Sequence, residues 1–158
     1  RGVPLGEDIS GRLDVAALAN APGFPSEGPA DATITMLVFS DYACGVCRQV
    51  EPWWRDAVRA AGDVRVVHRD WPILGAQSLR AAQFALAADE QRHYLSVHNA
   101  LMRSPGLSEP ALRSAIVGAG ADWELLTRDL ATKARGINSK LARTAQDAVR
   151  LGFRGTPG

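Results

Sequence analysis

The chain has 158 residues and two cysteines, Cys44 and Cys47, which stand three positions apart. A disulfide between them would close a loop too short to constrain the unfolded chain by much, because loop-entropy stabilisation grows with loop length. If both lie in the first turn of a helix, the rise of about 1.5 Å per residue places their Cα atoms roughly 5 Å apart, within disulfide range. The spacing therefore predicts a reversible redox disulfide.

Two other uses of the cysteine pair remain open. A zinc site would need two further ligands at suitable spacing, and the best-placed donors, His93 and His98, are five residues apart and do not share a helix face. The other alternative is two unrelated buried thiols. We favour redox chemistry, and so expect neither a metal nor another cofactor.

The residues before the cysteines predict a strand that leads into a helix. Residues 33–39, TITMLVF, are rich in β-branched and apolar side chains, which is typical of a strand buried on both faces. Ser40 and Asp41 end this strand, and either side chain can accept hydrogen bonds from the free amides of the following helix. Cys44 is then expected at or near the first helical turn.

The residues after the cysteines complete a strand, helix, strand unit. Pro52 falls inside the helix and predicts a kink, because it cannot bond back to the preceding turn. After Gly62, residues 64–68, VRVVH, predict a second strand. Residues 33–68 are most simply a parallel, right-handed unit.

The rest of the chain predicts helices. Apolar residues recur at helical spacing over 79–101, on one or two helices, and a further helix is expected from Ser108 to the glycines at 118 and 120. Residues 122–130 predict a short helix and residues 138–151 the last one. The segment 21–29, which contains proline and glycine, is expected to be a loop.

Composition narrows the function classes. With 46% hydrophobic residues, the chain is expected to form one globular domain. Eighteen basic and seventeen acidic residues leave a formal charge of +1, which disfavours nucleic acid and anionic membranes as partners. No apolar run approaches the roughly 18 residues of a membrane span. Because the chain begins at Arg1 rather than Met, we expect an upstream segment, such as a secretory signal.

These motifs together resemble the DsbA-like thiol-disulfide oxidoreductases of the thioredoxin superfamily. The motifs are DYACGVC after an apolar strand, the proline five residues beyond the second cysteine, HRDWPILG after the second strand, an Ala-rich helical block, and LGFRGTPG. The match covers most of residues 31–158. It implies an α/β, thioredoxin-like fold in a single domain, 1–158, with a core of 31–74 plus 152–158 and a helical insertion at 75–151.

The resemblance also implies roles for individual residues. Pro157 would be a cis-proline that faces the active site and takes part in catalysis, and Thr156 would offer backbone hydrogen bonds to a substrate peptide. Gly45 and Val46, between the cysteines, are expected to contact substrate as well. The alternative for Pro157 is an ordinary trans-proline turn, since cis is the minority state of X-Pro bonds.

The two cysteines are expected to divide the chemistry. The thiolate is the nucleophile in disulfide exchange, and the free amides at a helix N-terminus would stabilise Cys44 as an anion. Cys47, one turn further in, would be the resolving thiol. Arg48 could favour the Cys44 thiolate or be a solvated surface charge, and Asp41 would oppose it. A helix terminus contributes about 0.3 to 2 kcal/mol, at most roughly 1.5 pKa units, so other donors must assist.

The sequence departs from the family pattern at two places: the dipeptide between the cysteines, and a strand position where many relatives carry a buried acid. Gly45 and Val46 replace the proline and histidine of the best-known members and supply no side-chain donor, so we expect a more moderate oxidant. Val38 stands where many relatives carry a buried acid that assists proton movement. His68 and Asp70 are candidate substitutes, although a strand histidine is more often a satisfied core residue.

Tryptophans and the chain end give two further expectations. Trp53, Trp54 and Trp71 could line a groove for unfolded substrates, but we favour packing against helix faces. The chain ends at Gly158, where the thioredoxin fold would continue into two strands and a helix. We therefore expect the C-terminal strands and helix to be missing and the open sheet edge to be covered by the N-terminal residues, by another chain, or in a swapped or domain-completing oligomer.

The resemblance implies a dithiol oxidase that exchanges disulfides with unfolded or partly folded cysteine-containing proteins in the periplasm or another extracytoplasmic compartment. A membrane redox partner linked to quinones would recycle it, and no nucleic acid partner is expected. Two alternatives stay open: a disulfide reductase or isomerase kept reduced in the same compartment, and a non-redox peptide-binding module on the same fold.

Overall fold

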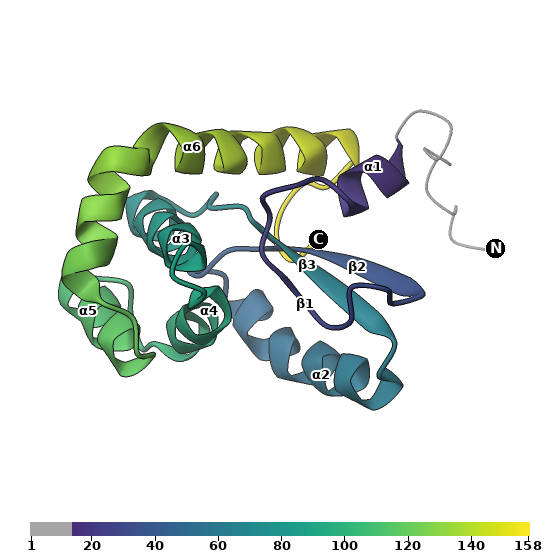
Figure 1. Ribbon diagram of the computed structural model, residues 1–158, viewed down its shortest axis with the longest axis horizontal. Helices are drawn as coiled ribbons and strands as arrows, with labels where there is room; N and C mark the ends of the chain where they lie inside the picture. The colour runs from purple at the N-terminus through teal and green to yellow at the C-terminus, as the bar shows by residue number, and fades with distance from the viewer. Residues whose placement is uncertain (1–13) are drawn as a thin grey trace.

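The computed structural model of the chain describes residues 14–158 (Figure 1). The first thirteen residues of the expected 1–158 domain, and any segment upstream of them, lie outside the described residues. A three-stranded sheet stands beside a group of helices. The sheet consists of β1 (Ser26–Glu27), β2 (Ile34–Ser40) and β3 (Val64–Asp70), in the order β1-β3-β2.

The central unit is the expected strand, helix, strand arrangement. β2 and β3 are parallel, with Ile34 opposite Val64 at one end and Ser40 opposite Asp70 at the other. Between them, α2 (Gly45–Ala61) ends at Gly62, which takes the left-handed conformation that glycine adopts without steric cost. The helix continues through Pro52, and the expected kink there stays a prediction.

The expectation of a loop over 21–29 was wrong in part, because β1 lies within it. β1 pairs antiparallel with the side of β3 that faces away from β2, with Ser26 opposite Val67. Next to it, Gly28 has a φ of +90°, and a Cβ on this residue would lie 2.3 Å from the Val64 carbonyl oxygen. Only glycine fits this close approach. A strand of two residues is too short to show an alternating hydrophobic pattern. Only its hydrogen-bonded pairing with β3 identifies it as a strand.

The two faces of the sheet are covered by different helices. Side chains alternate between faces along a strand. Val38 and Val66 pack against Trp54 and other residues of α2, whereas Phe39 packs against the C-terminal half of α6 (Trp123–Arg150), around Ala148. The helices α2 and α6 therefore lie on opposite sides of the sheet.

Within the described part of the chain, residues 14–158, α2 is accompanied by five other helices: α1 (Val15–Ala19), α3 (Ala76–Asp89), α4 (Tyr94–Arg103), α5 (Glu109–Gly118) and α6. The start of α5 confirms the prediction of a helix at Ser108, which is its N-cap. The helices α3 to α6 build the larger apolar core, and this core also includes Tyr42, Cys44 and Cys47. The cysteines thus lie where the helical part meets the sheet. The division into core and insertion stays a prediction.

The expectation of two separate C-terminal helices was wrong. Residues 123–150 form one helix, α6, which bends near its middle (Figure 1). Gly136 lies midway along it, but a single glycine costs only about 1 kcal/mol in a helix. The buried stripe continues across it from Leu130 to Ile137 and Leu141, and this burial outweighs the cost of the glycine. Among residues 14–158 no helix is long and apolar enough to cross a membrane.

The β2–β3 pair has backbone partners on both sides. The N-terminal strand β1 covers β3, which is one of the coverings expected from the sequence. At the other edge, Gly158 and Phe39 exchange two backbone hydrogen bonds, of 2.9 and 3.0 Å. This pairing is that of an antiparallel strand neighbour of β2. A swapped or domain-completing oligomer stays a prediction.

Candidate active site

Cys44 is the N-cap of α2. Its backbone is extended, with φ −77° and ψ 111°, and its Sγ accepts a hydrogen bond from the Cys47 amide at 3.1 Å. The prediction that Cys44 lies at the helix start is confirmed. The expectation that Ser40 or Asp41 would cap the helix was wrong, because the thiol itself takes the position of the capping acceptor.

The surroundings of Cys44 favour its thiolate. Burial alone would raise the pKa of this thiol, but hydrogen bonds from the Cys47 thiol, from the Thr156 side chain and from the amides of Cys47 and Val46 outweigh burial and lower the pKa below its ordinary value. The thiolate is the reactive form in disulfide exchange. Cys44 therefore has the electrostatic environment of an attacking or leaving sulfur.

Cys47 has the opposite environment. Its side chain is buried, and burial, followed by the hydrogen bond with Cys44, raises its pKa to about 12. A thiol with such a pKa stays protonated at neutral pH, where it is a poor nucleophile. The two sulfurs are unbonded in the structure, and their environments differ; the attacking and resolving roles stay predictions.

The loop of Thr156 and Pro157 lies beside Cys44 although it is more than a hundred residues away in sequence. The Cys44 thiol donates to the Thr156 carbonyl oxygen at 3.6 Å, and the Thr156–Pro157 peptide bond is cis. The pairing of Gly158 with Phe39 holds this loop at the end of β2. A substrate role for Thr156 and a catalytic role for Pro157 stay predictions.

The expected site residues are brought together around one point of the surface. Cys44, Cys47 and Thr156 are joined by hydrogen bonds. Pro157 is exposed. Gly45 is exposed in the first turn of α2, next to Val46, whose side chain is 54% exposed. A partner peptide can therefore reach the dipeptide and the proline from solvent.

Asp41 has an anchoring role beside the site that the sequence did not reveal. Its buried carboxylate accepts hydrogen bonds from the amides of Ala43, Ile73 and Leu74, at 2.7, 2.8 and 3.0 Å, and from the Ser78 hydroxyl. It thereby ties the turn before Cys44 to the loop after β3 and to α3. The sequence placed Asp41 beside the cysteines but gave no sign of donors thirty residues away.

Arg48 is bound to backbone carbonyls rather than solvated, and its effect on the Cys44 thiolate stays a prediction. Its guanidinium donates to the carbonyl oxygens of Tyr42, Ser104 and Leu101, at 2.7, 2.5 and 3.4 Å. It is therefore neither a solvated surface charge nor hydrogen-bonded to Cys44. Arg48 binds the C-terminal end of α4, where free carbonyls and the helix dipole favour a cation, and so joins α2 to the helical part.

A buried polar network lies between α2, β3 and α4. The Tyr42 hydroxyl is 2.8 Å from His98 Nδ1, and His98 Nε2 is 3.0 Å from the Glu51 carboxylate. Burial would raise the pKa of Glu51, but the hydrogen bond and charge of His98, together with Arg55, lower it to about 2. This network positions α4 against the active-site helix. No local pattern in the sequence indicated it.

The two candidate substitutes for the missing buried acid are both buried on β3. Burial lowers the pKa of His68 to about 4 and raises the pKa of Asp70 to about 6. His68 binds Glu27 and Asp70 accepts from Tyr94. Within residues 14–158 neither forms a hydrogen bond with a cysteine sulfur, so a proton-transfer role for them stays a prediction. Val38 packs in the apolar cluster under α2.

Two of the three tryptophans considered for a substrate groove pack against other parts of the fold, which is the use that we favoured from the sequence. Trp54 packs against the sheet from α2, and Trp71 lies against Phe39. Trp53 is 75% exposed and covers no core. Among residues 14–158 no group of three or more His, Cys, Asp or Glu side chains could hold a metal ion.

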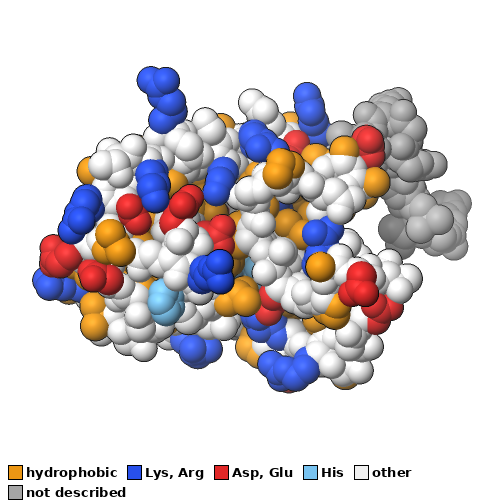
Figure 2. Space-filling model, viewed as in Figure 1, with side chains coloured by type: hydrophobic (Ala, Val, Ile, Leu, Met, Phe, Trp, Pro, Cys, Tyr) orange, Lys and Arg blue, Asp and Glu red, His pale blue; other side chains and the backbone are white. Residues whose placement is uncertain are grey.

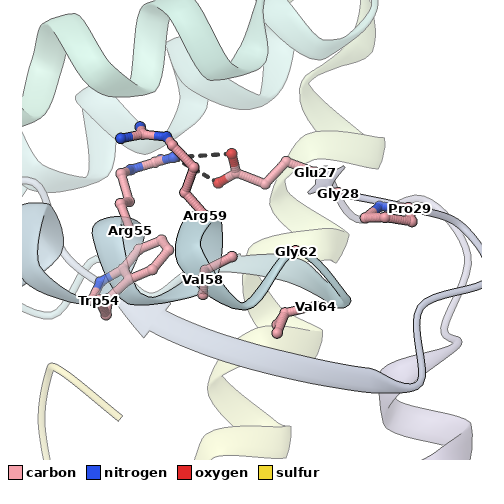
Figure 3. A pocket seen from close by; sticks show the side chains of 9 residues that line it. All are labelled: Glu27, Gly28, Pro29, Trp54, Arg55, Val58, Arg59, Gly62 and Val64. Carbon is pink, nitrogen blue, oxygen red and sulfur yellow. Dashed lines mark hydrogen bonds and ion pairs between the residues drawn. The ribbon is translucent and has the colours of Figure 1, made fainter.

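A pocket of about 220 Å³ lies away from the cysteines, between the second half of α2 and the segment around β1 (Figure 3). Within it, Arg55 Nη1 binds both carboxylate oxygens of Glu27, at 2.7 and 3.0 Å. Trp54 and Val58 supply its apolar wall. None of the residues at the redox site lines it, so the pocket is no part of the candidate active site.

Comparisons with known proteins agree with this geometry. A family model described as DSBA-like thioredoxin domain matches residues 35–158. A thioredoxin-like oxidoreductase from Silicibacter pomeroyi is 36% identical, with a TM-score of 0.86, over 92% of this chain and 83% of its own. The thiol-disulfide exchange protein alpha-DsbA2 of Wolbachia pipientis is 25% identical, with a TM-score of 0.85, over 94% and 80% of the two chains.

Two further similarities differ in extent. A periplasmic thioredoxin-like protein from Salmonella enterica serovar Typhimurium is 27% identical, with a TM-score of 0.75, over 90% of this chain and 80% of its own. The Na(+)/H(+) antiporter NhaA 1 of Salinispora arenicola is 30% identical over 86 residues, which are 53% of this chain but only 13% of the antiporter. The family match and the structural likeness confirm the predicted thioredoxin-like α/β fold, and the chain belongs to the DSBA-like thioredoxin domain family of thiol-disulfide oxidoreductases.

Proposed function

We propose that this protein is a dithiol oxidase that passes a Cys44–Cys47 disulfide to unfolded or partly folded cysteine-containing proteins. The observation that carries the proposal is the contrast between the two sulfurs. Cys44 caps a helix with a lowered pKa, whereas burial raises the pKa of Cys47 to about 12. This contrast supports a role for Cys44 in the contact with substrate and for Cys47 in resolution.

The exchange conserves electrons and the number of disulfide bonds. A substrate thiolate attacks Cys44 Sγ, the Cys44–Cys47 bond breaks, and Cys47 departs and takes up a proton. A second substrate thiolate then attacks the substrate sulfur of the mixed disulfide, and Cys44 departs as a thiolate. The substrate is oxidised by two electrons and the protein is reduced by two. A leaving thiol with a low pKa departs faster, so the low pKa of Cys44 favours the second step in this direction.

Apolar side chains near the site support unfolded segments as the substrate. Ile73 and Leu74 are 43% and 53% exposed, and their amides bind Asp41, three residues before Cys44. We propose that they and the exposed Val46 contact the apolar side chains of the substrate. Chains that have not yet buried their hydrophobic residues offer such side chains. We place Thr156 and Pro157 at the backbone of the bound segment.

We propose an extracytoplasmic location and a membrane redox partner, linked to quinones, that restores the disulfide. The similarity to the Salmonella protein, which is described as periplasmic, supports the location. Disulfides persist in such compartments. The second candidate is a reductase or isomerase, which Gly45 and Val46 favour because they give Cys44 no side-chain donor.

Trapping thiols in living cells and measuring the reduction potential test the direction of exchange. We expect the pair to be mainly oxidised in its native compartment. We expect a potential between about −120 mV, the value of the strongest oxidants of the family, and about −270 mV, that of thioredoxin. A pair that is mainly reduced in cells, with a potential near that of thioredoxin, would assign the reductase function instead. A potential as high as that of the strongest oxidants would contradict the moderate oxidant expected from the dipeptide.

A further inference from the structure

The small net charge of the chain hides an uneven distribution. After Asp129 the chain contains one of its seventeen acidic residues, Asp147. The same segment contains six of the eighteen basic residues. Asp147 is largely buried and forms an ion pair with the buried Arg69. It therefore does not neutralise the outer surface of α6. The part of the chain after Asp129, most of which lies in α6, is therefore basic, although the whole chain is nearly neutral.

Three arginines of α6 share its outer face. Arg135, Arg143 and Arg150 recur every seven or eight residues, which at 3.6 residues per turn places them on one face. All three are exposed, and they lie opposite the stripe that buries Ile137 and Leu141. Lys and Arg side chains project along the upper margin of the molecule, where Figure 1 places α6 (Figure 2). We call the three residues the α6 arginine ridge.

The ridge is available to a partner. The ion pairs found among residues 14–158 do not involve its three arginines. Arg143 lies over the Phe24 ring, 5.0 Å from its centroid, and remains exposed. One apolar side chain stands in the same part of the helix, since Val149 is 68% exposed.

We propose that the α6 arginine ridge docks the protein on a bilayer surface that carries anionic lipids. The ridge lies on α6, along the convex outer margin of the molecule (Figure 1). A convex surface of this kind fits a flat partner better than it fits a concave binding site on another protein. One guanidinium group can donate two parallel hydrogen bonds to two oxygens of a phosphate. Basic residues are also attracted to the negative charge of an anionic leaflet. The exposed Val149 can pack at the boundary of headgroups and acyl chains, whereas nucleic acid would leave it without an apolar partner.

Docking through α6 leaves the redox site accessible. The helices α2 and α6 cover opposite faces of the sheet, and Cys44 lies at the start of α2. A bilayer against the ridge therefore does not cover α2. The protein would be held at the membrane with its cysteine pair free, whichever direction disulfide exchange takes.

Sedimentation with vesicles tests the proposal. The probes are vesicles of phosphatidylglycerol and phosphatidylcholine in equal parts, and vesicles of phosphatidylcholine alone. The variants are the triple change R135Q, R143Q and R150Q, and the double change R135Q and R150Q, which leaves the contact of Arg143 with Phe24 intact. The control is the triple change R59Q, R103Q and R113Q, which removes the same charge from exposed arginines on other helices. Circular dichroism checks that each variant is folded.

We expect the parent protein to bind the anionic vesicles at low salt, to release at high salt, and not to bind the neutral ones. The ridge triple variant should lose at least about tenfold in partition coefficient and the double variant a smaller factor, while the control stays within about twofold of the parent. No binding by the parent, or an equal loss in the control, would overturn the proposal. Binding through the ridge to polyglutamate or RNA but not to vesicles would overturn the lipid assignment.

Discussion

Replacing Cys44 with serine should reduce disulfide exchange with a reduced, unfolded substrate to the uncatalysed rate. A serine hydroxyl can neither form the mixed disulfide nor depart as a stabilised anion. Replacing Cys47 with serine should leave Cys44 able to react and should trap the mixed disulfide, because no resolving thiol remains. Gel electrophoresis without reductant, after incubation with a substrate that carries one activated disulfide, separates the two outcomes.

The two serine variants serve as controls for each other, because both remove one buried sulfur from the same helical turn. Equal loss of the covalent adduct in both would point to misfolding, which circular dichroism reports independently. If Cys44→Ser still formed the adduct through Cys47 at a rate close to that of the parent, the assignment of the two sulfurs would be wrong. A non-redox binding module would keep its activity in Cys44→Ser.

Replacing Asp41 with alanine should lower the free energy of unfolding by about 3 kcal/mol, because several donors lose their acceptor at once. The amides of Ala43, Ile73 and Leu74 and the Ser78 hydroxyl all donate to this carboxylate. The turn before Cys44 and the apolar loop after β3 would then lose their common anchor. We therefore expect slower disulfide exchange together with the lower stability. Urea unfolding measures the first effect.

Asp56→Ala is the matched control for Asp41→Ala. Asp56 lies on α2 as an exposed partner of Arg59, at 3.0 Å, with a side-chain exposure of 74%. Exposed pairs contribute about 0 to 1 kcal/mol, so this variant should unfold almost as the parent does. A loss below about 1 kcal/mol in Asp41→Ala, similar to that of the control, would contradict the anchoring role.

The parts of the fold that follow from local pattern were predicted well. The apolar run before Cys44, the glycine after α2 and the β-branched second strand lie within 36 residues, and β2, α2 and β3 follow from them. The position of Cys44 at the helix start follows for the same reason. In each case the signal and the structure it specifies occupy the same stretch of chain.

The parts that depend on distant contacts were missed or were wrong. The donors to Asp41 come from a loop and a helix thirty residues later, and the partner of Tyr42 is His98 on α4. β1 exists only through its pairing with β3. The continuity of α6 across Gly136 rests on burial against other helices rather than on propensity. Sequence periodicity carries no information on such partners.

Alkylation of the reduced protein as a function of pH, with the modified residue identified by mass spectrometry, tests the central claim most directly. Only the thiolate reacts, so the pH at which the rate is half its maximum reports the pKa. Because the pKa of Cys44 is lowered, its rate should reach half-maximum at a lower pH than that of an ordinary free cysteine, while Cys47, with a pKa of about 12, should stay unreactive at neutral pH. In urea both midpoints should return to the ordinary value. A midpoint for Cys44 at or above that value in the folded protein, or faster reaction at Cys47, would contradict the account.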